Sequence, residues 1–280
     1  MLAPGTRVGE YVIVRRVAVG ATGDVHEGRQ TASGEPVAVK VLHPEWCVHA
    51  EVVARFLNEA QALQELRHPH LVTAVSSGVL ADGPPFIVLE WLPVDLHQVL
   101  ASAGGRLPAE DGARVVRQLA DVLAALHAKG LVHRDLKPAN VLVARREPGA
   151  LEVKLADLGL AKRIAGEGAL RSALPVSTAG SALLGTGEFM APEQWVRSKS
   201  VDSRVDVYAL GVLWFQMLAG RPPFTGPEQK DLMFQHLLEP PALHLLEGRA
   251  PERTRALVAR MLEKKPERRP SLAEVLAGRT

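Results

Sequence analysis

The chain contains a single cysteine, Cys47, among its 280 residues. An internal disulfide is therefore excluded, and so is a fold that relies on disulfides instead of a hydrophobic core. We expect Cys47 to be a small, half-buried apolar residue in a protein of the reducing cytoplasm. Net charge is also small, because 33 Lys and Arg residues oppose 31 Asp and Glu residues and leave +2. This even balance argues against nucleic acid as a partner.

Long apolar runs are missing as well. The most apolar stretch, residues 207–220, is interrupted by Gln216 and is shorter than the roughly 20 residues of a membrane-spanning helix. The N-terminus has neither the charged block nor the apolar block of a secretory signal. The ten histidines show no spacing typical of a metal site. We therefore expect a cytoplasmic chain without a membrane segment, in which residues 207–220 form a buried helix.

Strand patterns dominate the first ninety residues. Four β-prone runs are expected to be strands: 11–17, 25–30, 37–42 and 86–92. A helical period covers residues 51–66. The stretch between the first two runs, residues 18–24, contains Gly20 and Gly23 and is typical of a hairpin connection. We call residues 18–24 the glycine loop.

Helical patterns dominate beyond Pro93. Residues 109–129 place an apolar stripe on one side of a helix and stop at Gly130, a residue favoured at helix C-termini. The stripe consists of Val115, Leu119, Val122 and Leu126. More helices joined by Pro/Gly turns are expected from about Pro192 onward. The two halves are expected to meet near residues 90–94, where a nucleotide cleft would lie.

A polar loop between two expected strands, residues 131–132 and 141–143, carries the most specific signal. Residues 133–140 read His-Arg-Asp-Leu-Lys-Pro-Ala-Asn, and Asp157-Leu158-Gly159 follows another strand. The loop supplies a carboxylate, an ammonium and an amide, and residue 157 adds a second carboxylate. Transfer of a phosphoryl group to a hydroxyl needs such a set: a base, a cation for the moving charge and oxygen ligands for magnesium.

Turn formation is the alternative interpretation of these polar residues. Asp135 and Asn140 could be Asx-turn residues, although Lys137 between them argues against this. Asp157 could open a turn before Gly159, and that role is compatible with metal binding.

Lys40 lies in the expected strand 37–42, where it shares a face with the small Ala38. Burying the ammonium of a lysine in such a strand costs free energy unless it pairs with an anionic group. Glu59 offers a partner, because it falls inside the apolar stripe of the helix 51–66. That stripe consists of Val52, Phe56, Leu63 and Leu66. We expect a buried ion pair between Lys40 and Glu59; the alternative is that Glu59 extends to solvent from the edge of the stripe.

The glycine loop is weaker evidence by itself. Gly20 and Gly23 would let backbone amides approach phosphate oxygens, because no Cβ stands in the way. Two glycines between strands usually mark only a turn. The position of the loop ahead of Lys40 favours phosphate binding.

In these motifs the chain resembles the eukaryotic-type protein kinases, and more closely their bacterial serine/threonine branch. The resemblance extends over residues 11–278 and includes an Ala-Pro-Glu run at 191–193. It implies an α+β, bilobal protein-kinase-like fold with three parts: a small antiparallel β lobe with helix C (11–90), a hinge (90–94) and a larger, mainly helical lobe (95–278). It also implies a serine/threonine protein kinase that transfers the ATP γ-phosphoryl group to Ser/Thr hydroxyls of proteins.

The resemblance further implies where ATP would bind. Glu90 and Leu92 would bind adenine through their backbone, Leu89 would be the gatekeeper, and Ala38 and Leu142 would enclose the ring. The implied nucleotide-binding residues are Val17, Ala18, Gly20, Gly23, Val25, Ala38, Lys40, Leu89, Glu90, Leu92 and Leu142.

The implied chemistry is equally specific. The catalytic residues would be Asp135, Lys137, Lys40, Glu59 and Thr186. Among them Asp135 would be the base, and Lys137 would contact the γ-phosphate. Asn140 and Asp157 would be the ligands of Mg²⁺, which Mn²⁺ could replace.

Two supporting interactions and one regulatory segment follow from the same resemblance. Glu193 would pair with Arg269, and Asp206 would brace the catalytic loop, although capping the apolar helix is an alternative role for Asp206. Arg134, next to the base, suggests control by a phosphate on the activation segment, with autophosphorylation of that segment. The acceptor candidates are Ser172, Ser177, Thr178 and Ser181, with Thr178 or Ser181 preferred; plain flexibility of this segment is the alternative.

The chain departs from the family pattern at three places. Ala18 replaces the first glycine of the glycine loop, and Leu158 replaces the phenylalanine after the metal-binding aspartate. The hinge continues into Pro93-Val94-Asp95, so the ribose contact is open, with Asp95 as the candidate. We expect Ala18 to stiffen the loop and Leu158 to fill the same apolar socket.

Three functions remain to be compared. An active protein kinase acting on protein substrates, with a homodimer as one route to autophosphorylation, fits all the motifs. A pseudokinase scaffold that binds nucleotide without turnover is the second, and only Ala18 favours it. A small-molecule kinase on a related fold is the third, but such proteins lack the Ala-Pro-Glu run and its downstream arginine.

Overall fold

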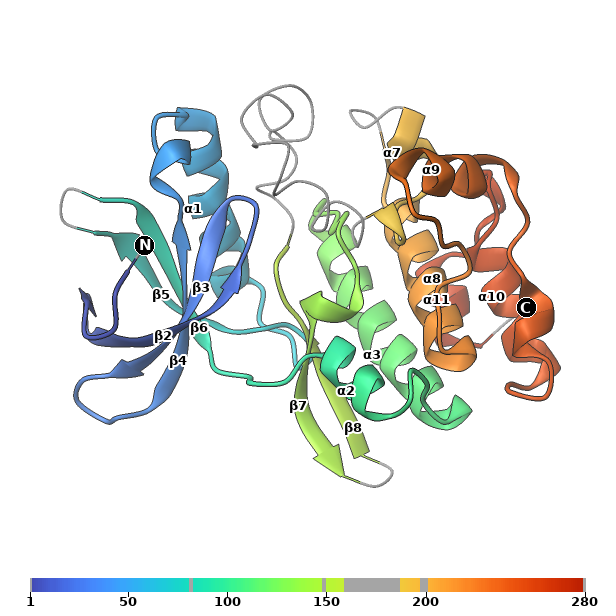
Figure 1. Ribbon diagram of the computed structural model, residues 1–280, viewed down its shortest axis with the longest axis horizontal. Coiled ribbons are helices and arrows are strands. Elements are labelled where there is room, and N and C mark those ends of the chain that lie inside the picture. Colours follow the sequence, from blue (N-terminus) through green and yellow to red (C-terminus); the bar gives the residue numbers. More distant parts are fainter. Residues whose placement is uncertain (1, 81–82, 148–149, 159–186, 197–200, 279–280) are drawn as a thin grey trace. The chain divides into compact units, whose positions relative to one another are not determined.

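The computed structural model describes residues 2–80, 83–147, 150–158, 187–196 and 201–278. These residues form two compact units (Figure 1). The first, which we call the strand unit, takes the described residues up to Pro93 except His68–His70. The second, the helical unit, takes His68–His70 and the described residues from Val94 onward.

The strand unit contains a six-stranded antiparallel sheet with the order β1-β2-β3-β4-β6-β5. The strands are β1 (Arg7–Val8), β2 (Tyr11–Val19), β3 (Gly23–Gln30), β4 (Pro36–Leu42), β5 (Ala74–Val79) and β6 (Pro85–Glu90). Between β4 and β5 the chain forms the 3₁₀ turn η1 (Pro44–Trp46) and helix α1 (Ala50–Glu65). The four predicted strands and the predicted helix are all present. Strands β1 and β5 were not predicted, because a two-residue strand and a small, partly polar edge strand leave little pattern in a sequence.

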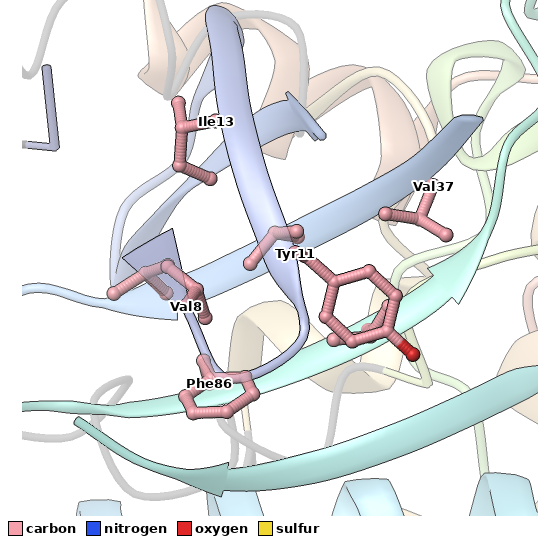
Figure 2. Packing of buried hydrophobic residues seen from close by; sticks show 8 residues of the cluster. Val8, Tyr11, Ile13, Val37 and Phe86 are labelled. Atoms are coloured by element: carbon pink, nitrogen blue, oxygen red, sulfur yellow. The ribbon is translucent and has the colours of Figure 1, made fainter. Parts of the chain in front are cut away.

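The alternation predicted for β4 is confirmed by the two cores of this unit. Val37, Val39 and Val41 pack on one face of the sheet with Tyr11 and Phe86 (Figure 2). The full cluster on that face is Val8, Tyr11, Ile13, Val37, Val39, Val41, Phe86 and Val88. Leu42 points to the other face, where its cluster includes two residues of the predicted stripe of α1, Val52 and Phe56. The full cluster on this face is Leu42, Trp46, Val52, Phe56, Ala60 and Ile87.

The helical unit is built around two long helices. Its helices are α2 (Leu96–Ser102), α3 (Ala109–Ala128), α7 (Pro192–Val196), α8 (Arg204–Ala219), α9 (Gln229–Leu238), α10 (Glu252–Met261) and α11 (Leu272–Leu276). Its 3₁₀ turns are η2 (Pro138–Asn140), η4 (Leu243–Leu246) and η5 (Pro266–Arg268). The hairpin β7 (Val141–Glu147) and β8 (Ala150–Leu155) is antiparallel. The predicted stripe of α3 is fully buried, and Gly130 follows the helix with φ 72°, as a left-handed residue after a helix end should.

Helix α8 contains the apolar stretch that was expected to be a buried helix. From Val205 to Phe215 every side of α8 is buried, which explains why its sequence shows no amphipathic period. The helix ends at Gly220, whose φ of 89° suits a residue without a Cβ. None of the helices in the described part of the chain is long and apolar enough to cross a bilayer.

One predicted strand is wrong. Residues 131–132 have no strand conformation, because β7 pairs with β8, with Val141 opposite Leu155. Leu131 instead donates its N–H to the Leu126 carbonyl and closes the end of α3. A short apolar run after a helix therefore served helix termination rather than sheet formation.

Candidate active site

Lys40 and Glu59 form the predicted ion pair inside the strand unit. Lys40 Nζ lies 2.8 Å from Glu59 Oε1, and the side chains are only 10% and 2% exposed. Strand β4 positions the lysine and the inward face of α1 positions the glutamate. The alternative in which Glu59 extends to solvent is therefore wrong.

Cross-strand register brings several of the expected nucleotide-binding residues together. Ala18 on β2 pairs with Val25 on β3, and Val25 pairs with Lys40 on β4. Directly opposed residues project to the same face of a sheet, so these three lie in one row. Ala38 pairs in turn with Leu89 on β6. The glycine loop itself is shorter than predicted, because β2 continues to Val19 and β3 begins at Gly23.

The end of β6 carries the expected adenine contacts at Glu90 and Leu92. The Glu90 N–H donates to the Thr73 carbonyl at 3.0 Å, and its carboxylate accepts from the Thr73 N–H at 2.7 Å. The backbone N–H of Glu90 is therefore engaged within the unit. Asp95, the candidate for the ribose, caps α2 by accepting from the Gln98 N–H at 2.7 Å, so its carboxylate has a structural role in this structure.

The catalytic loop of the helical unit gathers a carboxylate, an ammonium and an amide. Lys137 Nζ lies 3.1 Å from Asp135 Oδ2. The Asn140 amide donates to the Asp135 carbonyl at 2.8 Å and to its Oδ2 at 2.9 Å. Asp135 is buried, and a small pocket beside it is lined by Arg134, Asp135, Leu136, Phe189 and Met190. These contacts fix the orientation of Asp135 more firmly than an Asx turn alone would require.

Two contacts position Asp157 next to this loop. The Ala156 N–H donates to the Asn140 carbonyl at 2.9 Å, and His133 Nε2 lies 3.2 Å from the Ala156 carbonyl. Because the Asp135 N–H donates to His133 Nδ1, the imidazole carries its proton on Nε2 and donates to Ala156. Leu158, only 2% exposed, fills an apolar position, as expected.

Asp206 braces the catalytic loop, and the alternative helix-cap role is wrong. Its Oδ2 accepts from the His133 N–H at 2.9 Å and its Oδ1 from the Arg134 N–H at 2.8 Å. The side chain is completely buried and also meets His127 Nε2 at 2.8 Å. Helix α8 is preceded by Ser203 as its cap residue, which places Asp206 inside the first turn.

The brace explains an unusual backbone at the site. Arg134 has φ 63° and Asp157 has φ 59°, the only positive values among the described non-glycine residues. Left-handed backbone is unfavourable for a side chain as large as arginine. The two N–H groups bound by Asp206 hold residues 133 and 134 in place, and so offset this strain.

Oxygen ligands for a divalent cation are present at the expected residues. The Asn140 side-chain nitrogen donates two hydrogen bonds, and both go to Asp135. This leaves Oδ1 of Asn140 as the atom that would coordinate a metal. Asp157 adds a carboxylate. Amide and carboxylate oxygens suit Mg²⁺ and Mn²⁺, which usually take only one or two protein ligands when phosphates supply the rest. The residues therefore fit the metal that the resemblance implied.

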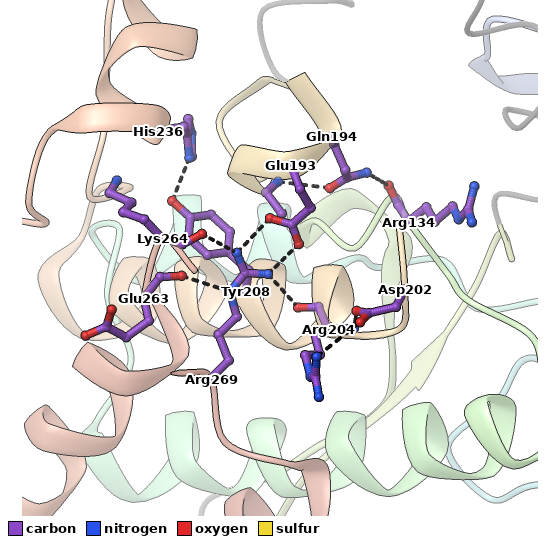
Figure 3. Close-up of polar contacts among 11 residues, drawn as sticks. Arg134, Glu193, Gln194, Asp202, Arg204, Tyr208, His236, Glu263, Lys264 and Arg269 are labelled. Carbon is purple, nitrogen blue, oxygen red and sulfur yellow. Dashed lines mark hydrogen bonds and ion pairs between the residues drawn. The ribbon is translucent and has the colours of Figure 1, made fainter. Parts of the chain in front are cut away.

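Glu193 and Arg269 form the second predicted ion pair. Arg269 Nη1 and Nη2 reach the two oxygens of Glu193 at 2.6 and 2.7 Å, and the arginine side chain is fully buried (Figure 3). The guanidinium also donates to the carbonyls of Glu263, Lys264 and Arg204 and lies 4.8 Å from the Tyr208 ring. It thereby joins α7 to α8 and to the chain before α11.

Helix α9 contributes a histidine that the sequence analysis missed. His236 is fully buried, and its Nδ1 lies 2.8 Å from the Tyr208 hydroxyl (Figure 3). Its ring also forms a T-shaped contact with the Phe224 ring, with the centroids 4.8 Å apart. Burial, together with the positive charge of Lys264, lowers the pKa of His236 to about 3. The residue is polar within an unremarkable helix, so nothing in the sequence marked it.

Replacement of His236 by glutamine is expected to reduce the acid sensitivity of folding. An unfolded histidine binds a proton below about pH 6.5, whereas the folded His236 does not until about pH 3. The contribution of the neutral His236 to the free energy of unfolding is therefore fully present above about pH 6.5. It is lost as the pH falls, by about 1.4 kcal/mol per pH unit. The free energy of unfolding, measured in urea between pH 7 and pH 5, should fall less steeply with decreasing pH in His236→Gln. The difference in slope should be about this amount. Equal slopes in the two proteins would contradict the assignment.

The remaining expected residues fall outside the described part of the chain. Thr186 and the acceptor candidates Ser172, Ser177, Thr178 and Ser181 all lie there. Arg134, expected to respond to a phosphate there, donates from Nη2 to the Val201 carbonyl at 3.2 Å. Its carbonyl accepts from Gln194 Nε2 at 3.3 Å (Figure 3).

A curled antiparallel sheet with a Lys–Glu pair and a helical unit with an Asp-Lys-Asn loop define the protein kinase fold. A family model described as protein kinase domain matches residues 11–279. The chain belongs to this family. The predicted fold class is thereby confirmed.

Named relatives are bacterial kinases. The chain is 37% identical to serine/threonine-protein kinase pkn2 of Myxococcus xanthus over 285 residues, covering 99% of this chain and 33% of the relative. It is 34% identical to PknB of Mycobacterium tuberculosis, covering 96% and 42%. A crystal structure of the Mycobacterium tuberculosis PknI kinase domain, a double mutant, has a TM-score of 0.71 at 27% identity and covers 99% of this chain and 97% of that one. The chain thus spans between a third and a half of the length of the curated relatives it matches.

Proposed function

We propose that this chain is an active serine/threonine protein kinase that uses ATP and Mg²⁺ and phosphorylates proteins, including its own activation segment. The observation that carries the proposal is the contact set of Asp135, which touches both Lys137 and Asn140. A purely structural aspartate would not need an ammonium and an amide in the same loop. The complete Lys40–Glu59 pair supports the proposal independently.

Each of these side chains has one task in the proposed reaction. Asp135 accepts the proton of the substrate hydroxyl as its oxygen bonds to the γ-phosphorus and the bond to ADP breaks. Lys137 lies within reach of the same carboxylate and stabilises the negative charge of the transferred group. Lys40, aligned by Glu59, binds the ATP phosphates.

Asn140 and Asp157 would hold the metal, which neutralises charge on the phosphates when bound. The backbone contacts of Ala156 and His133 position these two residues. Because Asn140 also donates to Asp135, it couples the metal site to the base. We assign the other nucleotide-binding residues named in the sequence analysis, such as Val17 and Leu142, the roles that the family resemblance implied. The same holds for Thr186.

The pseudokinase alternative is less well supported. Loss of the lysine, the base or a metal ligand is the usual reason for inactivity, and this chain has all three. Ala18 is the one departure in its favour, and it lies in β2 opposite Val25, where an alanine is accommodated. A homodimer for autophosphorylation and a cytoplasmic location, where ATP is supplied, complete the proposal.

Phosphate transfer by the purified chain is the direct test. With Mg-ATP and a generic protein substrate, we expect phosphoserine or phosphothreonine on the substrate and on the activation segment, detected by mass spectrometry. Excess EDTA should abolish the transfer, and added Mn²⁺ should restore it, because the ligands are hard oxygens. Nucleotide binding without any transfer would contradict the proposal and favour a scaffold.

A further inference from the structure

A short segment after β4, residues 43–46, is attached firmly to the core of the strand unit. Trp46 is only 3% exposed and packs with Leu42, Val52 and Phe56 on the same face of the sheet as α1. The segment continues from β4, the strand of Lys40. We call residues 43–46 the anchor segment.

The anchor segment makes three polar contacts with the glycine loop. The Trp46 indole Nε1–H donates to the Ala21 carbonyl at 3.2 Å. The His43 N–H donates to the Thr22 carbonyl at 2.9 Å, and His43 Nε2 lies 2.9 Å from Asp24 Oδ1. The loop is therefore bound at successive points around its tip, and two of these contacts come from side chains.

Asp24 is the charged end of this attachment. It is only 6% exposed, and its second oxygen lies 3.4 Å from Arg16 Nη1 on β2. Burial alone would raise the pKa of Asp24, but the bonds and charges of His43 and Arg16 hold it below its usual value. A buried carboxylate with an imidazole and a guanidinium as partners is a specific arrangement rather than a solvated surface charge.

The backbone is also packed tightly where the loop rejoins the sheet. A Cβ on Gly23 would clash with the Val41 carbonyl oxygen. Gly20 in turn donates its N–H to the Gly23 carbonyl at 3.0 Å. Close packing at Gly23 and this hydrogen bond restrict the loop although it contains two glycines.

We propose that Asp24, His43 and Trp46 are positioning residues that fix the glycine loop in the conformation that receives the phosphates of ATP. This inference rests on the proposed function, because it takes ATP as the ligand of the loop. A loop that is ordered before binding loses less conformational freedom when its amides meet phosphate. The attachment therefore compensates for the flexibility that Gly20 and Gly23 introduce, and its effect should depend on the phosphates and not on the adenine.

The test uses the whole chain and three variants: Trp46→Phe, His43→Gln and Asp24→Asn. Phenylalanine keeps an aromatic ring in the core, is smaller than the indole, and lacks the N–H that binds Ala21. Calorimetry should show ATP binding weakened by about fivefold to tenfold per lost contact, with adenosine binding unchanged. Hydrogen exchange of the amides in residues 18–25, measured without nucleotide, should become faster by a similar factor.

Glu27→Gln is the matched control. Glu27 lies on the same strand as Asp24 and pairs with Arg15 at 2.8 Å, but it makes no contact with the anchor segment in the described contacts. This control should change neither ATP affinity nor loop exchange. Equal weakening of ATP and adenosine, or unchanged exchange in all three variants, would overturn the proposal. If the unaltered chain binds no ATP, the kinase proposal fails, and loop exchange alone then decides whether the anchor exists.

Discussion

Asparagine in place of Asp135 is expected to slow phosphoryl transfer by about 10²- to 10⁴-fold, the usual contribution of a general base. The substitution retains the size of the side chain and an oxygen that can still accept from Asn140 and Lys137. It removes the negative charge, and with it the ability to accept the hydroxyl proton. Single-turnover transfer to a peptide, measured by radiolabelled ATP, gives the rate of the chemical step directly.

A second measurement separates chemistry from binding in this variant. ATP affinity should be nearly unchanged, because Asp135 is assigned to the hydroxyl and not to the nucleotide. Asp121→Asn is the matched control, since Asp121 lies on α3 in the same unit with a side chain that is 56% exposed. Transfer by Asp135→Asn at the rate of the control would sink the assignment of the base.

Removal of Arg269 is expected to lower the free energy of unfolding by about 3–5 kcal/mol, the usual effect of breaking a buried pair on one side. Alanine at this position would leave Glu193 without its partner and three carbonyl groups without their donor. Arg269→Lys should recover only part of the loss, because an ammonium cannot make the bidentate contact. Urea unfolding followed by circular dichroism at pH 7 measures all of these proteins.

Arg260→Ala provides the comparison for Arg269. Arg260 pairs with Glu274 at 2.9 Å, but the two side chains are 35% and 40% exposed, so its loss should cost less than about 1 kcal/mol. A similar small effect of Arg269→Ala would show that the network around Tyr208 is not required for stability. The difference between the two arginines is thus a test of burial rather than of charge.

Ordered motifs made most of the site predictable. Glu59 could be assigned because an acid inside an apolar stripe needs a partner, and β4 offered only one cation, Lys40. The stripe of α3 and the alternation of β4 were predictable for a similar reason, because helical and strand periods decide which side chains face the core. The two periods are local properties, each complete within one element, whereas the Lys40–Glu59 pair joins two elements.

Apart from the two predicted ion pairs, interactions between distant segments were not predictable from pattern. Asp206 could have been a helix cap or a brace, and only the packing of α8 against the catalytic loop distinguished the two. The strand expected at residues 131–132 failed because the partner of β7 was β8. No pattern in the sequence marked His236 or the anchor segment. Their side chains are of ordinary type, and their contacts are with residues far away in the sequence.

Motifs and their spacing along the chain were enough to identify the family and the polar residues of the catalytic loop. Which of the other buried polar groups meet became clear only from the fold. Desolvation makes each such group dependent on a particular partner, and that partner is chosen by the three-dimensional path of the backbone. Arg134 illustrates this, because the carboxylate of Asp206, from a distant helix, binds its N–H and so offsets the cost of its left-handed backbone.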